Sequence, residues 1–104
     1  MAKKPETIFK ERVQKDLKRE IKNGWFFKVQ QRSLRGIPDV IGCVKGKFVA
    51  MELKVPRTKT QVKADPLQEW VLSKIILANG IAMVVTPMNW QEVLTRLKAL
   101  EGES

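Results

Sequence analysis

Hydrophobic residues recur at helical spacing in three stretches of this 104-residue chain. Thr7 precedes the first stretch as a candidate N-cap, and Asn89 has the same position before the last. Asn23-Gly24 and Gly80 follow the first and second stretches, where they are typical of helix ends. The pattern therefore predicts three helices, over residues 8–22, 67–79 and 90–100.

Shorter β-rich runs lie between these helices. Lys45-Gly46 separates two of the runs and predicts a tight hairpin. The expected strands cover residues 25–31, 38–44, 48–55 and 81–86, and residues 56–66 read as a loop. The element order is α-β-β-β-α-β-α, which indicates an α/β fold with a mixed sheet flanked by helices. The length fits a single domain over residues 1–104.

Composition excludes several classes of protein and of chemistry. No apolar run approaches a membrane span, and the first residues lack the apolar core of a signal peptide, so we expect a cytoplasmic protein without membrane contact. The chain has no histidine, which removes Ser-His-Asp and Cys-His catalysis. Its one cysteine, Cys43, excludes an internal disulfide. The remaining chemistry uses carboxylates, lysine, hydroxyls or a metal held by oxygen.

Positive charge is concentrated in the first two thirds of the chain. Residues 1–63 contain 17 Lys/Arg and 6 Asp/Glu, a balance of +11, whereas residues 64–104 contain 3 and 5, a balance of −2. A basic surface of this kind favours a polyanion such as nucleic acid. The alternative is a solvated basic face that only maintains solubility.

Asp39, Glu52 and Lys54 form the most informative group of polar residues. If Lys45-Gly46 is a two-residue turn, paired residues have numbers that sum to 91, and Asp39 lies opposite Glu52. Side chains alternate along a strand, so Lys54 shares this face. Two opposed carboxylates destabilise a sheet unless a cation compensates, and oxygen ligands suit Mg²⁺ or Mn²⁺. The alternative is that all three are ordinary strand-surface charges, and a three-residue turn would separate the pair.

The same residues resemble a known nuclease signature. Gly36-Ile37-Pro38-Asp39, a gap of 12 residues and then Glu52-Leu53-Lys54 are similar to the motif of the PD-(D/E)XK nuclease superfamily. More narrowly, the chain resembles the VRR-NUC family, the virus-type replication-repair nucleases, over residues 6–98. Arg35 before the first motif and Pro66-Leu67-Gln68 after the second strengthen this resemblance.

The resemblance implies a role for each matching residue. Asp39 and Glu52 are expected to be metal ligands, together with the backbone carbonyl of Leu53. Lys54 is expected to orient the attacking water and to stabilise charge on the phosphate. Gln68 would support the site from its rim. The family also places a glutamate on the first helix.

We assign this first-helix glutamate to Glu11, with Glu6 as the rival. Glu11 also fits an ordinary i,i+4 ion pair with Lys15.

The expected activity is metal-dependent, structure-selective endonucleolytic hydrolysis of DNA, in branched substrates such as four-way (Holliday) junctions. The resemblance further implies a restriction-endonuclease-like αβββαβ core, a homodimer, a phage or prophage source and no small-molecule cofactor. The apolar residues of the last helix and Trp90 are candidates for the dimer interface, although burial in the core is the favoured reading for most of them. The alternatives are a basic module that binds DNA without cutting it and, more weakly, an RNA-associated protein. The basic residues expected to bind phosphates are Arg32, Arg35, Arg57, Lys59 and Lys63.

Overall fold

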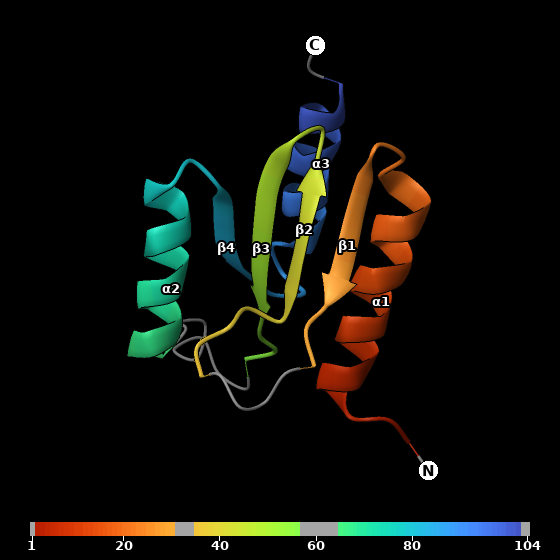
Figure 1. The fold of residues 1–104 in the computed structure, drawn as a ribbon. Helices are drawn as coiled ribbons and strands as arrows, with labels where there is room; N and C mark the ends of the chain where they lie inside the picture. The colour runs from red at the N-terminus through yellow and green to blue at the C-terminus, as the bar shows by residue number, and fades with distance from the viewer. Residues whose placement is uncertain (1, 31–34, 57–64, 103–104) are drawn as a thin grey trace.

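Helices and strands follow one another along the chain in the order that the sequence predicts, which confirms the α/β class (Figure 1). The computed structural model describes residues 2–30, 35–56 and 65–102. Within them the elements are α1 (Pro5–Glu20), β1 (Gly24–Lys28), β2 (Val40–Val44), β3 (Lys47–Leu53), α2 (Pro66–Leu77), β4 (Ile81–Val85) and α3 (Trp90–Glu101). None of the described helices is long and apolar enough to cross a membrane.

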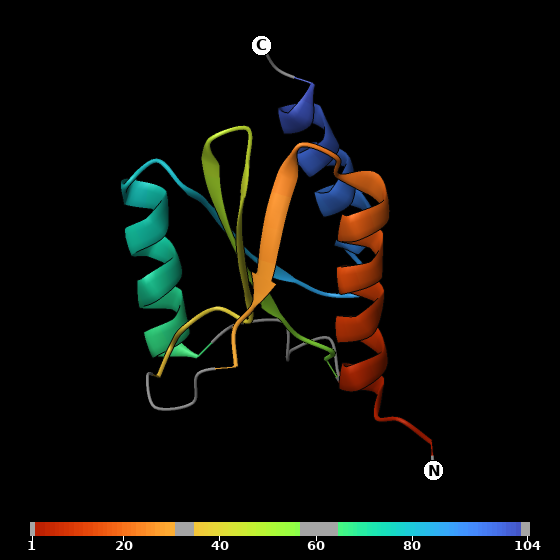
Figure 2. The same ribbon diagram turned by 45° about the vertical axis from the view of Figure 1, so that its right-hand side comes forward.

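The strands form one mixed sheet in the order β1-β2-β3-β4. β1 and β3 both run antiparallel to β2, whereas β3 and β4 are parallel. A parallel pair needs a crossover connection, and α2 lies within that connection. Figure 2 shows α2 on one face of the sheet and α1 with α3 on the other. This is the arrangement of an αβββαβ core with an additional C-terminal helix.

The hydrophobic core lies between the sheet and the two helices α1 and α3. α1 contributes apolar side chains at a spacing of four residues, and Trp90 of α3 is completely buried. Val93, Leu94 and Leu97 of α3 are buried in the same core. The core reading is therefore confirmed for these residues, because they pack within the monomer and are not available for a dimer interface.

The hairpin between β2 and β3 has the predicted two-residue turn. Lys45 and Gly46 both have positive φ values, 49° and 85°, which is the conformation of a type I′ turn. Ile41 pairs with Ala50 and Cys43 pairs with Phe48. The predicted register, in which paired residues sum to 91, is thus confirmed.

Several predicted element boundaries are corrected by the caps that the structure uses. α1 begins at Pro5, so Thr7 lies inside the helix and Lys4 is its N-cap residue. α2 begins at Pro66, because the side chain of Asp65 caps it. β2 begins only at Val40, since Pro38 has no N–H to extend the ladder.

The end of α2 depends on Asn79 rather than on Gly80. Asn79 adopts the left-handed conformation (φ 69°), and its N–H donates to the Ile76 carbonyl at 3.0 Å. The Gly80 N–H donates to the Ile75 carbonyl at 2.8 Å. A Cβ at Gly80 would lie 2.7 Å from Ile75 Cγ2, so this position needs glycine for space.

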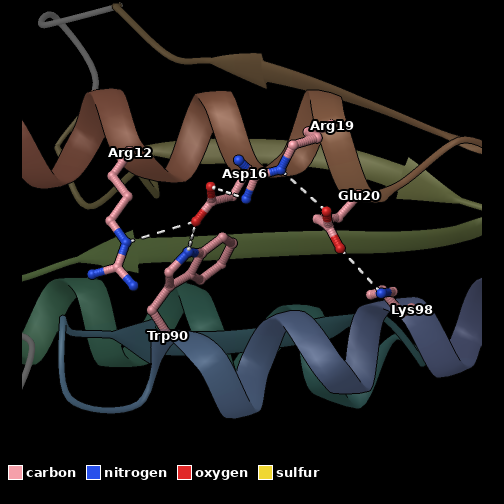
Figure 3. Close-up of polar contacts among 6 residues, drawn as sticks. All are labelled: Arg12, Asp16, Arg19, Glu20, Trp90 and Lys98. Carbon is pink, nitrogen blue, oxygen red and sulfur yellow. Dashed lines mark hydrogen bonds and ion pairs between the residues drawn. The ribbon is translucent and has the colours of Figure 1, made fainter.

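A buried polar cluster joins α1 to α3. Asp16 of α1 accepts a hydrogen bond from the Trp90 indole N–H at 2.8 Å (Figure 3). Arg19 donates to the other carboxylate oxygen at 3.0 Å, and Arg12 lies 3.7 Å away. The cluster therefore satisfies the indole N–H inside the core and holds the two helices together.

Candidate active site

Two carboxylates meet at the open end of the β2–β3 hairpin. Val40 pairs with Met51, so the preceding residue, Asp39, is next to Glu52 in the same register. The backbone N–H of Leu53 donates to Asp39 Oδ2 at 2.8 Å. This bond fixes the Asp39 carboxylate against β3, and the structure thereby brings together the pair that the sequence predicts.

Glu52 is the most deeply buried charged residue among those described. It is 2% exposed, and its Oε2 has no hydrogen-bond partner in the described part of the chain. Lys54 Nζ lies 4.0 Å from this oxygen. Burial and, after it, the adjacent Asp39 together raise the pKa of Glu52 to about 8, because the opposing effect of Lys54 is smaller. With both carboxyl groups ionised, the pair would lack a full complement of positive charge.

Lys10 of α1 is a second cation at this site, beside Lys54, that the sequence interpretation missed. Its Nζ lies 3.9 Å from Asp39 Oδ1. Lys10 directly follows the buried Phe9. A residue next to the apolar stripe of α1 lies near the sheet, and the sequence contains this signal. Because the contact crosses from a helix to a hairpin, periodicity alone did not reveal it.

The two candidate glutamates of α1 occupy different environments. Glu11 is exposed, and both of its oxygens accept hydrogen bonds from Lys3, at 2.9 and 3.0 Å, rather than pairing with Lys15. Glu6 lines a pocket of about 250 Å³ together with Lys10 and Lys54. Of the two, Glu6 is therefore the residue that lies beside the candidate site.

Gln68 has a structural role at the start of α2. Its backbone N–H donates to the Asp65 carboxylate at 2.9 Å, and its side-chain oxygen accepts from the Asp65 N–H at 3.1 Å. This is a capping box. The helix start packs against the turn at Gly36 (φ 82°), where a Cβ would lie 2.7 Å from Leu67 Cγ. The turn that leads into Asp39 and the start of α2 are therefore neighbours.

Basic residues line a second pocket at Asp39. This pocket has a volume of about 530 Å³, and Lys10 and Lys28 line it together with Asp39 and Pro38. Arg35 is exposed in the turn before these residues. The predicted phosphate-binding residues Arg32, Arg57, Lys59 and Lys63 lie outside the described residues.

The donor set at the hairpin fits a hard divalent cation. Asp39 and Glu52 provide carboxylate oxygens, one of which is buried without a partner, and such ligands suit Mg²⁺ or Mn²⁺. No cluster of three or more His, Cys, Asp or Glu side chains occurs in residues 2–30, 35–56 and 65–102. Among the described residues, the protein would thus contribute two side-chain ligands, Asp39 and Glu52. Leu53 lies between Glu52 and Lys54, and its backbone N–H orients the Asp39 carboxylate.

Comparisons of the chain with protein-family models, with curated proteins and with solved structures found no match. The assignment of the site therefore depends on the residues and on their geometry.

Proposed function

We propose that this protein is a divalent-metal-dependent nuclease that hydrolyses phosphodiesters of DNA at the Asp39–Glu52 site. The observation that supports the proposal most directly is the buried Glu52 oxygen without a hydrogen-bond partner, next to a second carboxylate. An apolar sheet gains no stability from such a pair, because each buried charge costs several kcal/mol unless it is compensated. Binding of a cation explains why both residues occupy this position.

The bound metal ion would supply a Lewis acid for the scissile phosphate and a water of lowered pKa. Asp39 and Glu52 would hold the ion, and the Leu53 N–H keeps the Asp39 carboxylate in position. Lys54 would orient the attacking water and stabilise the charge that develops on the phosphate. Lys10 and Lys28 line the pocket on the Asp39 side, where they would attract the phosphate backbone.

We further propose branched DNA as the preferred substrate and a homodimer as the active species. The described residues of one protomer form one such site, so two protomers would be needed to cut both strands of a symmetric junction. The first-helix acid of this mechanism is Glu6, because it shares a pocket with Lys54.

The test is a cleavage panel of four-way junction, flap, single-stranded and linear duplex DNA, with Mg²⁺, Mn²⁺ or EDTA. Asp39→Asn and Glu52→Gln should each lower cleavage by at least about 10³-fold, because each removes a negative ligand, and should leave DNA affinity nearly unchanged. Glu92→Gln is the control, since it neutralises an exposed carboxylate on α3.

Full activity of either site variant would refute the assignment. Metal-independent binding of every substrate without cleavage would favour the alternative, a DNA-binding module that does not cut.

A further inference from the structure

One half of the sheet presents exposed aromatic side chains to solvent. Trp25 is 64% exposed and Phe27 is 49% exposed on β1, and Phe48 is 43% exposed on β3. Their neighbour Phe26 points to the opposite face, where it packs against the core. α2 packs on β3 and β4, and Figure 1 looks onto the face of β1 and β2 that α2 leaves open.

Strand register places these rings on one continuous surface. Trp25 pairs with Cys43, and Cys43 pairs with Phe48, so the three side chains form a row across the sheet. The rings of Trp25 and Phe27 lie 5.9 Å apart with an interplanar angle of 17°, which makes a nearly flat apolar surface. Buried aromatic rings are the ordinary outcome in a monomer, so a flat exposed set indicates a binding surface.

A groove continues this surface toward α2. It has a volume of about 680 Å³, and its walls include Phe48 from β3 and Trp70 from α2. Trp70 is 57% exposed, and Lys74 Nζ lies 5.6 Å from the centre of its ring. Lys47 and Lys74 are the charged residues among the described ones that line the groove, and both are positive.

This combination of aromatic rings and positive charge selects among possible occupants. A second copy of the chain in a two-fold interface would place this basic groove against an identical basic groove, without an acidic partner for Lys47 or Lys74 among the described groove residues. A purely apolar ligand would leave both ammonium groups without a partner. A single DNA strand matches both features, because its bases stack on aromatic side chains while its phosphates pair with lysine.

We propose that Trp25, Phe27, Phe48 and Trp70, with Lys47 and Lys74, form an aromatic platform that binds an unpaired strand of DNA. The choice of DNA rather than RNA rests on the proposed nuclease function, whereas the binding itself requires no cleavage. Glu52 lies on the same face of β3 four residues beyond Phe48, which is about 13 Å at roughly 3.3 Å per residue. A strand on the platform therefore leads to the candidate active site, so among branched DNA substrates those with a single-stranded arm should be preferred.

The first test measures binding of a 12-nucleotide oligothymidylate to the wild-type protein in EDTA, where metal-dependent cleavage is absent. Trp25 and Trp70 are exposed and Trp90 is buried, so stacking should quench the tryptophan emission. Trp25→Ala and Trp70→Ala should each weaken binding by about tenfold. Both side chains are exposed, so these variants should fold, and their circular dichroism spectra check this.

Met88→Ala is the matched control, because it removes another exposed apolar side chain that is not part of the platform. A loss of affinity in Met88→Ala equal to that in Trp70→Ala would overturn the proposal. An oligouridylate that binds more tightly than the oligothymidylate would overturn the assignment to DNA.

The second test uses Cys43, the single cysteine of the chain, which is exposed in the row between Trp25 and Phe48. Saturating oligothymidylate should slow alkylation of this thiol by about tenfold or more, whereas a double-stranded oligonucleotide of the same length should not. Unchanged alkylation would overturn the proposal. Protection that depends on protein concentration without DNA would also overturn it, because a second copy would then cover the platform.

Failure of the cleavage panel with intact oligothymidylate binding would refute the nuclease and leave the platform. The reverse result would refute only the platform.

Discussion

The Glu52 carboxyl group links the candidate chemistry to the stability of the folded protein. In the unfolded chain this group has its ordinary pKa of 4.5, whereas burial and Asp39 raise the pKa to about 8 in the folded protein. Between these two values the folded state retains a proton that the unfolded state has lost. The free energy of unfolding therefore falls as pH rises from about 4.5 to about 8, and the contribution of Glu52 is constant above that range.

Glu52→Gln should remove this pH dependence and stabilise the metal-free protein at pH 9 by a few kcal/mol, because a neutral amide replaces a buried carboxylate. Asp39 and Lys54 face Glu52, and Lys10 faces Asp39; all three residues are the same in the two proteins that are compared. Urea unfolding from pH 5 to pH 9 measures the effect, with Glu92→Gln as the control.

Addition of Mn²⁺ at pH 8 gives a second readout of the same residue. It should raise the unfolding midpoint of the wild type and not that of Glu52→Gln, since ligands of the native state stabilise it by mass action. Equal pH profiles for the wild type and Glu52→Gln would contradict the assignment of a raised pKa.

The sequence predicts the carboxylate pair but not its helical neighbour. Asp39, Glu52 and Lys54 belong to one hairpin, so the type I′ turn and the alternation of side chains are sufficient to bring them together. Lys10 reaches Asp39 from α1, and the angle at which α1 crosses the sheet is not encoded in any local pattern. The sequence Asp65-Pro66-Leu67-Gln68 does contain a local signal, the capping box, and this signal accounts for Gln68.

At the scale of elements, the contact between α1 and α3 depends on one buried carboxylate. Asp16 accepts the indole hydrogen bond of Trp90 and neutralises the charge of Arg19 (Figure 3). A second pair, Glu20 with Lys98 at 3.1 Å, joins the same helices at the surface. Water screens this surface pair, and the pKa of Glu20 is lowered chiefly by its hydrogen bond from Lys98.

Asp16→Ala should lower the free energy of unfolding by about 1–3 kcal/mol, because the Trp90 N–H is left buried without an acceptor. Glu20→Gln is the matched control and should have little effect, since its pair is exposed to solvent. Guanidinium unfolding measures both. If Trp90→Phe abolishes the effect of Asp16→Ala in a double-mutant cycle, the hydrogen bond is its cause; additive losses would contradict this.

Element order was predictable because periodicity and turn residues are local properties. The start of α1 was wrong by three residues because Thr7 and Pro5 are both good helix-start residues, and proline at the first helical position prevailed. The faces that α1, α2 and α3 cover depend on packing between distant segments. For α2 the pattern gives no clear direction, since apolar residues occur on more than one side of it: Leu72 is buried while Ile76 and Leu77 are exposed.

At the scale of the molecule, these exposed residues of α2 suggest where two protomers meet. Ile76 is 54% exposed and Leu77 is 79% exposed, and neither lines the groove of the aromatic platform. Neighbouring apolar side chains that are exposed to this extent often mark a protein–protein interface. The proposed homodimer therefore uses the outer face of α2 and leaves the platform free for DNA.

Light scattering at micromolar concentration should give twice the monomer mass of 11.9 kDa for the wild type. Leu77→Asp should shift the population to the monomer by placing a charge in the interface. Met88→Asp, at another exposed apolar residue, is the control. A monomeric wild type would contradict the dimer.

The distribution of the site along the chain also has a consequence for the order of folding. Both carboxylates and Lys54 lie within residues 39–54, on or directly beside two strands that are joined by two residues, so their approach closes a short loop. β4 joins the sheet through the longer crossover that contains α2. We expect the hairpin to form before the parallel pair, because local pairing is faster than non-local pairing. During folding, the two negative charges would then meet before the sheet that buries them is complete.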